Sequence, residues 1–349
     1  MCNIAAYVGD RPAAPILIEM IRHQEGLNGG FFTGITTIDQ GRIGWRKLCG
    51  GLDHLLKNTD ASSLTGTVGL AHSRTPGGHD DRWAHPFISE KNGDTEISLV
   101  INGGFISFKD DAPGYVSIAK EILADGYRLN ATVKDGKSKL MLPEGAVHAC
   151  DLMCQLIMRN MDRGKDEPSA MADAFCQMPA EFVGLMLSRK YSDRVFFCRV
   201  SMPLFVGFAP HGVYMASTPT AFPEDAGEPI LIPPLTSGYV TKEGYCLSNY
   251  GDRFPKKVME ADADTLSRAN FLICEAMEKE PQTIPSLAKL LRAAFISDNC
   301  VPAAALIYSV LYSLKKQGRL IIETEDVPGA TEELTAKRCR LSIAPETQL

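Results

Sequence analysis

The chain has 349 residues, of which 45% are apolar and 22% charged, with a net charge of -6. This length predicts two domains with an ample core, in a protein of ordinary globular composition. The acidic excess argues against a global electrostatic grip on nucleic acid or anionic lipid, and no apolar run approaches the roughly 20 residues of a membrane span. Asp10 and Arg11 interrupt the first apolar stretch, which does not fit a secretory signal.

Ten cysteines are spread along the chain without the paired spacing of a zinc site or a disulfide framework. Cys150 and Cys154 stand four residues apart, with no second pair to complete a metal site. We therefore expect no metal and no cofactor, and most thiols should be small core residues in a reducing cytoplasm. Cys2 is the exception.

The first half of the chain predicts short strands separated by helices. A helix is expected at residues 14–24, and a hairpin turns around Asp39-Gln40-Gly41. The expected strands cover residues 3–9, 31–39, 41–48, 67–74 and 97–108.

The middle of the chain predicts three helices followed by a second block of strands. The helices are expected at residues 113–126, 146–162 and 168–178. The strands are expected at residues 182–189, 194–200, 204–209 and 213–218, with two more within 228–247. Two strand blocks with helices between them indicate an α+β fold in which two antiparallel sheets pack together and helices cover them.

A polar stretch at residues 249–258 predicts a boundary between one domain at 1–250 and another at 260–349. The second domain should contain helices at 264–280, 285–294 and 302–317, then two β-like runs, which is the order of a winged helix. It carries ten basic and 13 acidic residues, and its third helix is mostly apolar. Both features favour packing against the first domain or a partner over binding to DNA, although Lys315, Lys316 and Arg319 offer some positive charge.

Cys2 follows the initiator methionine, which aminopeptidases remove before small residues. The new N-terminus would combine a thiol with an α-amino group whose pKa is about 7.7 to 8.0. One residue would then supply both the nucleophile and the general base. The alternative is a chance cysteine at position 2.

A second signal lies at residues 69–87, where a strand leads into a glycine-rich loop. Arg74 could clamp a carboxylate in bidentate fashion, and Gly77 and Gly78 would let backbone N–H groups approach a ligand. A surface arginine before a turn is the plainer interpretation. His85, before Pro86, could serve the site or be structural, and taken alone it favours the structural role.

A third signal is Asn102-Gly103-Gly104, at the end of an apolar strand. The Asn102 side-chain amide and the Gly103 N–H could together form an oxyanion hole. The alternative is a simple Asn-Gly turn.

Three motifs follow one another along the chain. They are an N-terminal Cys, a strand ending in Ser-Arg before a loop with Ala-His-Pro, and a strand ending in Asn-Gly-Gly. In this order they resemble the pattern of the class II glutamine amidotransferases. These belong to the N-terminal nucleophile hydrolases. The likeness is closest to the glutaminase domain of glucosamine-6-phosphate synthase and covers residues 2–247, without the sugar isomerase domains. It implies a four-layer αββα fold and cleavage of the side-chain amide of glutamine.

The resemblance also implies roles for the site residues. The Cys2 thiolate would attack the amide carbon, and Asn102 and Gly103 would hold the oxyanion. Arg74 would bind the substrate α-carboxylate, with His85 as a further substrate-binding residue. An acidic residue should hold the substrate ammonium group, with Glu144, placed at the start of the helix after Pro143, as the candidate and Asp135 as its competitor.

Two segments depart from the family pattern. Thr75-Pro76-Gly77-Gly78 stands where Trp-Ala-Thr-His is usual, and residues 28–32 replace an Arg-Gly-x-Asp-Ser segment. Three functions therefore stay open: a glutaminase that releases ammonia or hands it to a partner protein, a hydrolase of another γ-glutamyl amide, and an inactive amidotransferase-like sensor. A homo-oligomer is left open.

Overall fold

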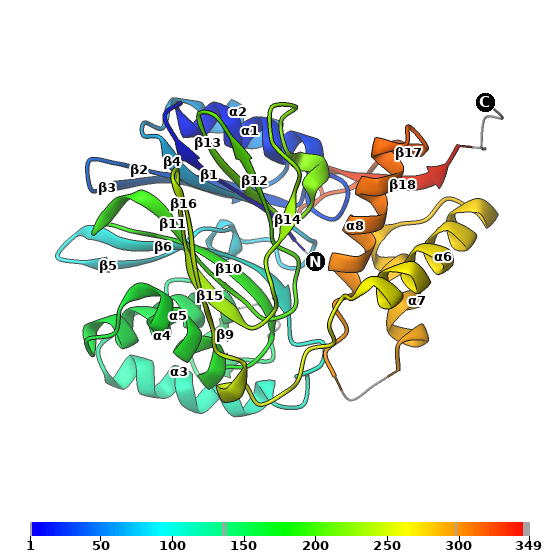
Figure 1. Cartoon of the computed structure of the whole chain (residues 1–349). Helices are drawn as coiled ribbons and strands as arrows, with labels where there is room; N and C mark the ends of the chain where they lie inside the picture. The colour runs from blue at the N-terminus through cyan, green and yellow to red at the C-terminus, as the bar shows by residue number, and fades with distance from the viewer. Residues whose placement is uncertain (1, 135, 137, 297–298, 345–349) are drawn as a thin grey trace.

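A computed structural model describes residues 2–134, 136, 138–296 and 299–344. Its first 250 residues form two antiparallel sheets that face each other, with helices outside both (Figure 1). Two helices cover the first sheet and three cover the second. They are α1 (Ala13–Gln24), α2 (Leu52–Asn58), α3 (Tyr115–Ala124), α4 (Ala149–Asp162) and α5 (Glu167–Gln177). The layers thus run helix, sheet, sheet, helix, as predicted.

The first sheet has seven strands with β1 in its interior. In sheet order they are β14 (Ile230–Leu231), β12 (Phe205–Ala209), β13 (Gly212–Ala216), β1 (Asn3–Gly9), β4 (Val68–Arg74), β2 (Phe32–Asp39) and β3 (Arg42–Cys49). β1 is an apolar run that is buried for nearly its whole length, as a strand covered on both faces requires. It pairs antiparallel with β4, and Asn3 lies opposite Ser73. This register brings Cys2 to the end of β4 that carries Arg74.

The second sheet has six strands and supplies the opposite wall. In sheet order they are β16 (Gly244–Asn249), β15 (Thr236–Thr241), β11 (Tyr191–Arg199), β10 (Glu181–Ser188), β6 (Asp94–Gly104) and β5 (Phe87–Lys91). β6 ends at the Asn102-Gly103-Gly104 segment, where Glu181 of β10 lies opposite Gly104. The ends of β1, β4 and β6 therefore meet between the two sheets.

The segment before α4 differs from the prediction. Residues 146–147 belong to a small sheet of β7 (Thr132–Val133), β9 (Gly145–Val147) and β8 (Met141–Leu142), and the helix begins only at Ala149. His148 caps the helix, since its side chain accepts a hydrogen bond from the Cys150 N–H. The placement of Glu144 at a helix start was wrong, because this residue is exposed in the turn between β8 and β9. Residues 228–247 also hold the start of a third strand, β16.

The C-terminal part has three helices and then a two-stranded hairpin, in the predicted order. Its elements are α6 (Ala263–Lys279), α7 (Ile284–Ala294), α8 (Ala303–Lys316), β17 (Leu320–Pro328) and β18 (Thr335–Ile343). The apolar face of α8 shares one core with Ile4, Leu27 and Met202 of the first part. This packing explains why α8 is apolar, and it leaves the helix unable to enter a DNA groove. The winged-helix assignment stays a prediction.

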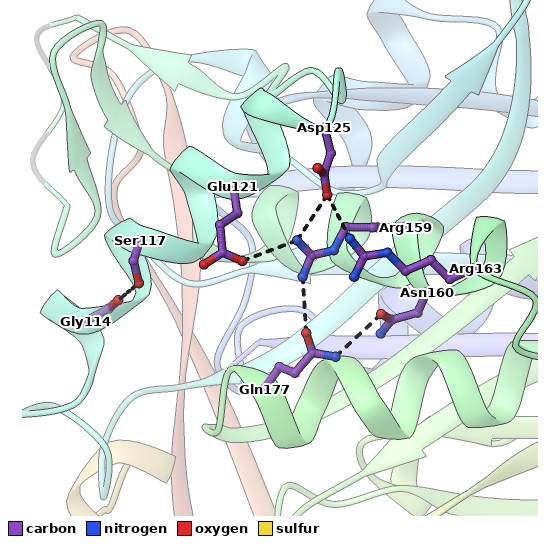
Figure 2. Close-up of polar contacts among 8 residues, drawn as sticks. All are labelled: Gly114, Ser117, Glu121, Asp125, Arg159, Asn160, Arg163 and Gln177. Atoms are coloured by element: carbon purple, nitrogen blue, oxygen red, sulfur yellow. Dashed lines mark hydrogen bonds and ion pairs between the residues drawn. The ribbon is translucent and has the colours of Figure 1, made fainter.

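Arg159 ties together the helices that cover the second sheet (Figure 2). Its side chain on α4 is 6% exposed and lies 3.5 Å from both Glu121 and Asp125 of α3. It also donates to Gln177 of α5 over 3.2 Å. Arg163, the C-cap residue of α4, reaches the same Asp125 from an exposed position.

We expect Arg159→Met to lower the free energy of unfolding by about 1 to 3 kcal/mol, because it leaves Gln177 without its donor and separates α3 from α5. Denaturant unfolding measures this difference. Arg163→Met is the matched control and should cost less than about 1 kcal/mol, since exposed ion pairs contribute little. Equal effects of the two substitutions would show that Arg159 does not hold α3, α4 and α5 together.

Candidate functional site

Cys2 lies where the three strand ends meet, and it is 7% exposed. Its backbone N–H donates to Asn102 Oδ1 over 2.7 Å. Its Sγ lies 3.7 Å from Thr75 Oγ1. The structure thus brings together the three signals that the sequence placed about 100 residues apart, and it adds Thr75 beside the sulfur.

His72 is a site residue that the sequence analysis missed. It is fully buried on β4, and its Nε2 lies 3.0 Å from the Ile101 carbonyl oxygen. A carbonyl oxygen only accepts, so Nε2 must carry a proton. Nothing else in the described part of the chain hydrogen-bonds Nδ1, so Nδ1 can take the Cys2 thiol proton and then donate it in a hydrogen bond to the thiolate sulfur. The signal was its position two residues before Arg74.

Burial alone would raise the pKa of the Cys2 thiol, because it penalises the thiolate. The hydrogen bond and charge of His72, with the charge of Arg74, outweigh burial and lower the pKa to about 6. Cys2 is therefore largely a thiolate at neutral pH, which is the nucleophilic form of cysteine.

We expect alkylation of Cys2 by iodoacetamide to speed up as pH rises, with a midpoint near pH 6. His72→Gln removes the largest lowering interaction while burial and Arg74 remain, so the midpoint should move upward. Peptide mass spectrometry reports the rate at Cys2 itself. His23→Gln, at an exposed position on α1, is the control and should leave the midpoint unchanged. A native midpoint near 9 would contradict the assignment.

Arg74 lines a cavity of about 480 Å³ together with Trp83, Asp80 and the glycine-rich loop. Its guanidinium lies over the rings of Phe32 and Trp83, 4.6 and 5.9 Å from their centroids. Within the described residues no carboxylate pairs with it, and it donates to the Gly77 carbonyl oxygen. Burial lowers the pKa of Arg74, and the Cys2 thiolate opposes this shift. An arginine held without an acidic partner at a cavity wall is suited to a substrate carboxylate.

The Asn102 side chain, expected to serve as an oxyanion donor, already makes hydrogen bonds within the protein. It is fully buried, its Oδ1 accepts from Cys2, and its Nδ2 donates to Ser217 Oγ over 3.3 Å. Asn102 therefore positions Cys2, and Nδ2 keeps one further hydrogen for an oxyanion. Gly103 has a φ of +135°, and a Cβ there would collide with the carbonyl oxygen of Glu181, so only glycine fits.

His85 stacks on His72, with ring centroids 3.7 Å apart, and does not line the Arg74 cavity. It is 2% exposed, and burial followed by the charges of His72 and His148 holds its pKa well below the ordinary value. A neutral ring behind His72 supports that residue. Lys47 fixes the same segment, because its ammonium donates to the carbonyl oxygens of Ala84 and Pro86 over 2.9 and 3.0 Å.

The candidates for the substrate ammonium group stay predictions. Glu144 is exposed and is not among the residues that line the Arg74 cavity. Asp135 lies outside the described residues, although Val133 and Gly136 on either side of it line the cavity. Asp80 also lines it, and its carboxylate is paired with Arg82.

The described residues include neither a metal site nor a membrane-spanning helix. No cluster of three or more His, Cys, Asp or Glu side chains there is arranged to hold a metal ion. None of the described helices has the length and apolar character needed to cross a bilayer.

The chain is similar in sequence to glutamine–fructose-6-phosphate aminotransferases (isomerizing). It is 23% identical to that of Pyrococcus horikoshii over 251 residues, which are 71% of this chain and 38% of the relative. It is 25% identical to that of Chlorobaculum tepidum over 268 residues, which are 75% of this chain and 40% of the relative. The chain thus spans less than half the length of these relatives. No protein-family profile matches it.

Solved structures show the same fold. The glutamine phosphoribosylpyrophosphate amidotransferase of B. subtilis matches 73% of this chain and 50% of its own, with a TM-score of 0.57 and 14% identity. A structure described as the allosteric regulatory enzyme of purine biosynthesis matches 93% and 66%, with a TM-score of 0.59 and 13% identity. The chain is therefore similar in sequence to glutamine–fructose-6-phosphate aminotransferases and shares the fold of the solved amidotransferase, which supports its resemblance to the class II glutamine amidotransferases.

Proposed function

We propose that the chain is a glutaminase-type amidohydrolase in which the Cys2 thiolate cleaves the side-chain amide of glutamine. The observation that carries the proposal is the contact between the Cys2 nitrogen and Asn102 Oδ1, 2.7 Å long. The Cys2 sulfur lies 3.7 Å from the hydroxyl of Thr75, the residue after Arg74, and Arg74 lines the cavity without a carboxylate partner among the described residues. The homology to enzymes that use glutamine supports the choice of substrate.

In the proposed reaction, removal of residue 1 frees the Cys2 α-amine, which Asn102 then orients. The thiolate forms a C–S bond to the amide carbon, and the oxyanion is held by Asn102 Nδ2 and the Gly103 N–H. The α-ammonium protonates the leaving nitrogen, the C–N bond breaks and ammonia departs. Water then cleaves the γ-glutamyl thioester, which yields glutamate and restores the thiol.

Arg74 holds the substrate α-carboxylate in this proposal, since a guanidinium binds a carboxylate with two parallel hydrogen bonds. The ammonium group is assigned to Glu144 or Asp135, with Asp80 added by its place in the cavity wall. The ammonia leaves to solvent or to a separate acceptor protein. In the proposal the C-terminal part is a winged helix, and it influences the reaction through its contact with the first part of the chain.

The proposal predicts that a glutamine-analogue diazoketone attaches to Cys2 with one equivalent per chain, because the thiolate attacks its electrophilic carbon. Intact mass and peptide mapping measure the label, and excess glutamine should slow labelling while excess leucine should not. The same intact mass shows whether the mature chain begins at Cys2. A Cys2 that stays unlabelled would favour the inactive sensor.

The size of the cavity favours one alternative substrate class, a γ-glutamyl amide with a larger leaving group. Its volume of about 480 Å³ lies in the range that accommodates drug-sized ligands, and glutamine is smaller than these. Comparing kcat/KM for glutamine with that for γ-glutamyl anilides and alkylamides decides between the two. A higher kcat/KM for the larger amides would show that such an amide, and not glutamine, is the preferred substrate.

A further inference from the structure

A second cavity, of about 310 Å³, lies between the C-terminal hairpin and the first part of the chain. Strand β18 forms one wall, and the segment at residues 26–31 with Pro76 forms the other. Figure 1 shows the hairpin of β17 and β18 reaching from the helical part toward the first sheet. We propose that this cavity, which we call the hairpin cavity, binds a phosphate-bearing small molecule.

The charge of the hairpin cavity carries the proposal. Lys337, Arg338 and Arg340 line it, and its described lining includes no carboxylate. Among the described residues, Glu325 is the carboxylate that pairs with the two arginines, at 3.7 Å from Arg338 and 3.2 Å from Arg340, so one carboxylate serves two guanidinium groups. The cavity therefore carries an excess of positive charge in a part of the chain that is net negative.

Two further features make the same cavity suited to an anion. Helix α7 has 11 residues and begins at its walls, since its N-cap Thr283 and Pro285 are lining residues. Pro285 has no N–H and the Ser286 N–H already donates to Thr283 Oγ1, so this helix end contributes the partial positive charge of its dipole rather than free donors. Asn28 also lines the cavity, and its buried Nδ2 has no hydrogen-bond partner among the described residues. A buried donor without a partner is costly, so an acceptor from a ligand would satisfy it.

This set of donors fits phosphate better than a carboxylate. Two guanidinium groups, an ammonium and an amide offer more donors than two carboxylate oxygens can accept, and a phosphate group offers three oxygens. The volume suits a small molecule, whereas a nucleic acid would need an extended basic surface.

The cavity lies next to the candidate active site without being part of it. Pro76 lines it and follows Thr75, whose hydroxyl is 3.7 Å from Cys2 Sγ. Phe31 lines it too, and its N–H donates to the Arg74 carbonyl oxygen over 3.1 Å. A bound anion would thus touch the segments that hold both Thr75 and Arg74.

Calorimetric titration of the full chain with pyrophosphate tests the proposal. It should be done in the Cys2→Ala background, so that the result does not depend on glutaminase activity. We expect saturable binding with one site, weakened at least about 10-fold by Arg340→Gln and by Lys337→Gln, since each removes a charge-assisted contact. Lys337→Gln leaves the Glu325 pairs intact, and thermal unfolding of each variant verifies folding.

Lys289→Gln is the matched control, because Lys289 is an exposed lysine of α7 that does not line the cavity. It should leave the affinity unchanged. Equal weakening by Lys289→Gln, or no saturable binding to the parent protein, would overturn the site. Citrate binding as tightly as pyrophosphate would overturn the assignment to phosphate.

Discussion

Cys2→Ala should reduce ammonia release from glutamine at least about 1,000-fold, to the background of the assay, because alanine has no thiol to form the acyl intermediate. The loss should appear in kcat, since the alanine leaves Arg74 and the cavity in place to bind substrate. A coupled glutamate dehydrogenase assay measures the ammonia, and calorimetry with glutamine measures the binding that remains.

Cys246→Ala provides the control for this prediction. Cys246 is an exposed thiol on β16, and we expect its replacement to leave the rate unchanged. An unaltered rate of ammonia release in Cys2→Ala would show that Cys2 takes no part in the reaction, and it would contradict the proposed function. Abolished binding together with abolished activity would instead show that alanine disturbs the cavity.

The two-sheet core could be predicted because its strands are apolar runs that end at glycines or turns. The meeting of Cys2, Arg74 and Asn102 could be predicted only through the resemblance to a family. Nothing in the chain states that Asn3 pairs with Ser73, since strand register follows from the packing of whole faces. Once that register is set, Cys2 and Arg74 are neighbours.

Other parts of the site could not be predicted because they depend on contacts between sheets and loops. The approach of His72 to the Cys2 sulfur requires both strands to be in place, and a buried histidine looks the same in sequence whether or not it faces a thiol. The error at Glu144 has a similar cause. Residues 145–147 are apolar enough for a helix, but pairing of β9 with β7 and β8 draws them into a sheet.

The apolar pattern of α8 correctly predicted that this helix packs against the first part of the chain, but it gave no sign of the ion pair that accompanies the packing. Arg292 of α7 donates to both carboxylate oxygens of Glu181, over 2.7 and 3.2 Å. These residues are 111 positions apart. No local pattern could relate them.

Arg292→Met should lower the free energy of unfolding by about 3 to 5 kcal/mol, because it leaves a buried carboxylate without its positively charged partner. The Glu181 side chain is 0% exposed, and within the described residues the Ser107 hydroxyl is its other hydrogen-bond partner. The loss should be visible as a shift in the denaturant midpoint. Lys279→Met, which removes an exposed pair with Glu275, is the control and should cost less than about 1 kcal/mol.

The double variant Glu181→Gln/Arg292→Met separates charge burial from packing. A neutral amide needs no counter-charge, so most of the loss should be recovered if the stranded carboxylate is its cause. Because Glu181 lies opposite Gly104 and its carbonyl oxygen closes off the space at Gly103, Arg292→Met should also slow ammonia release more than Lys279→Met does. A stable Arg292→Met protein with normal activity would mean that the C-terminal helices neither brace this strand nor influence the oxyanion site beside it.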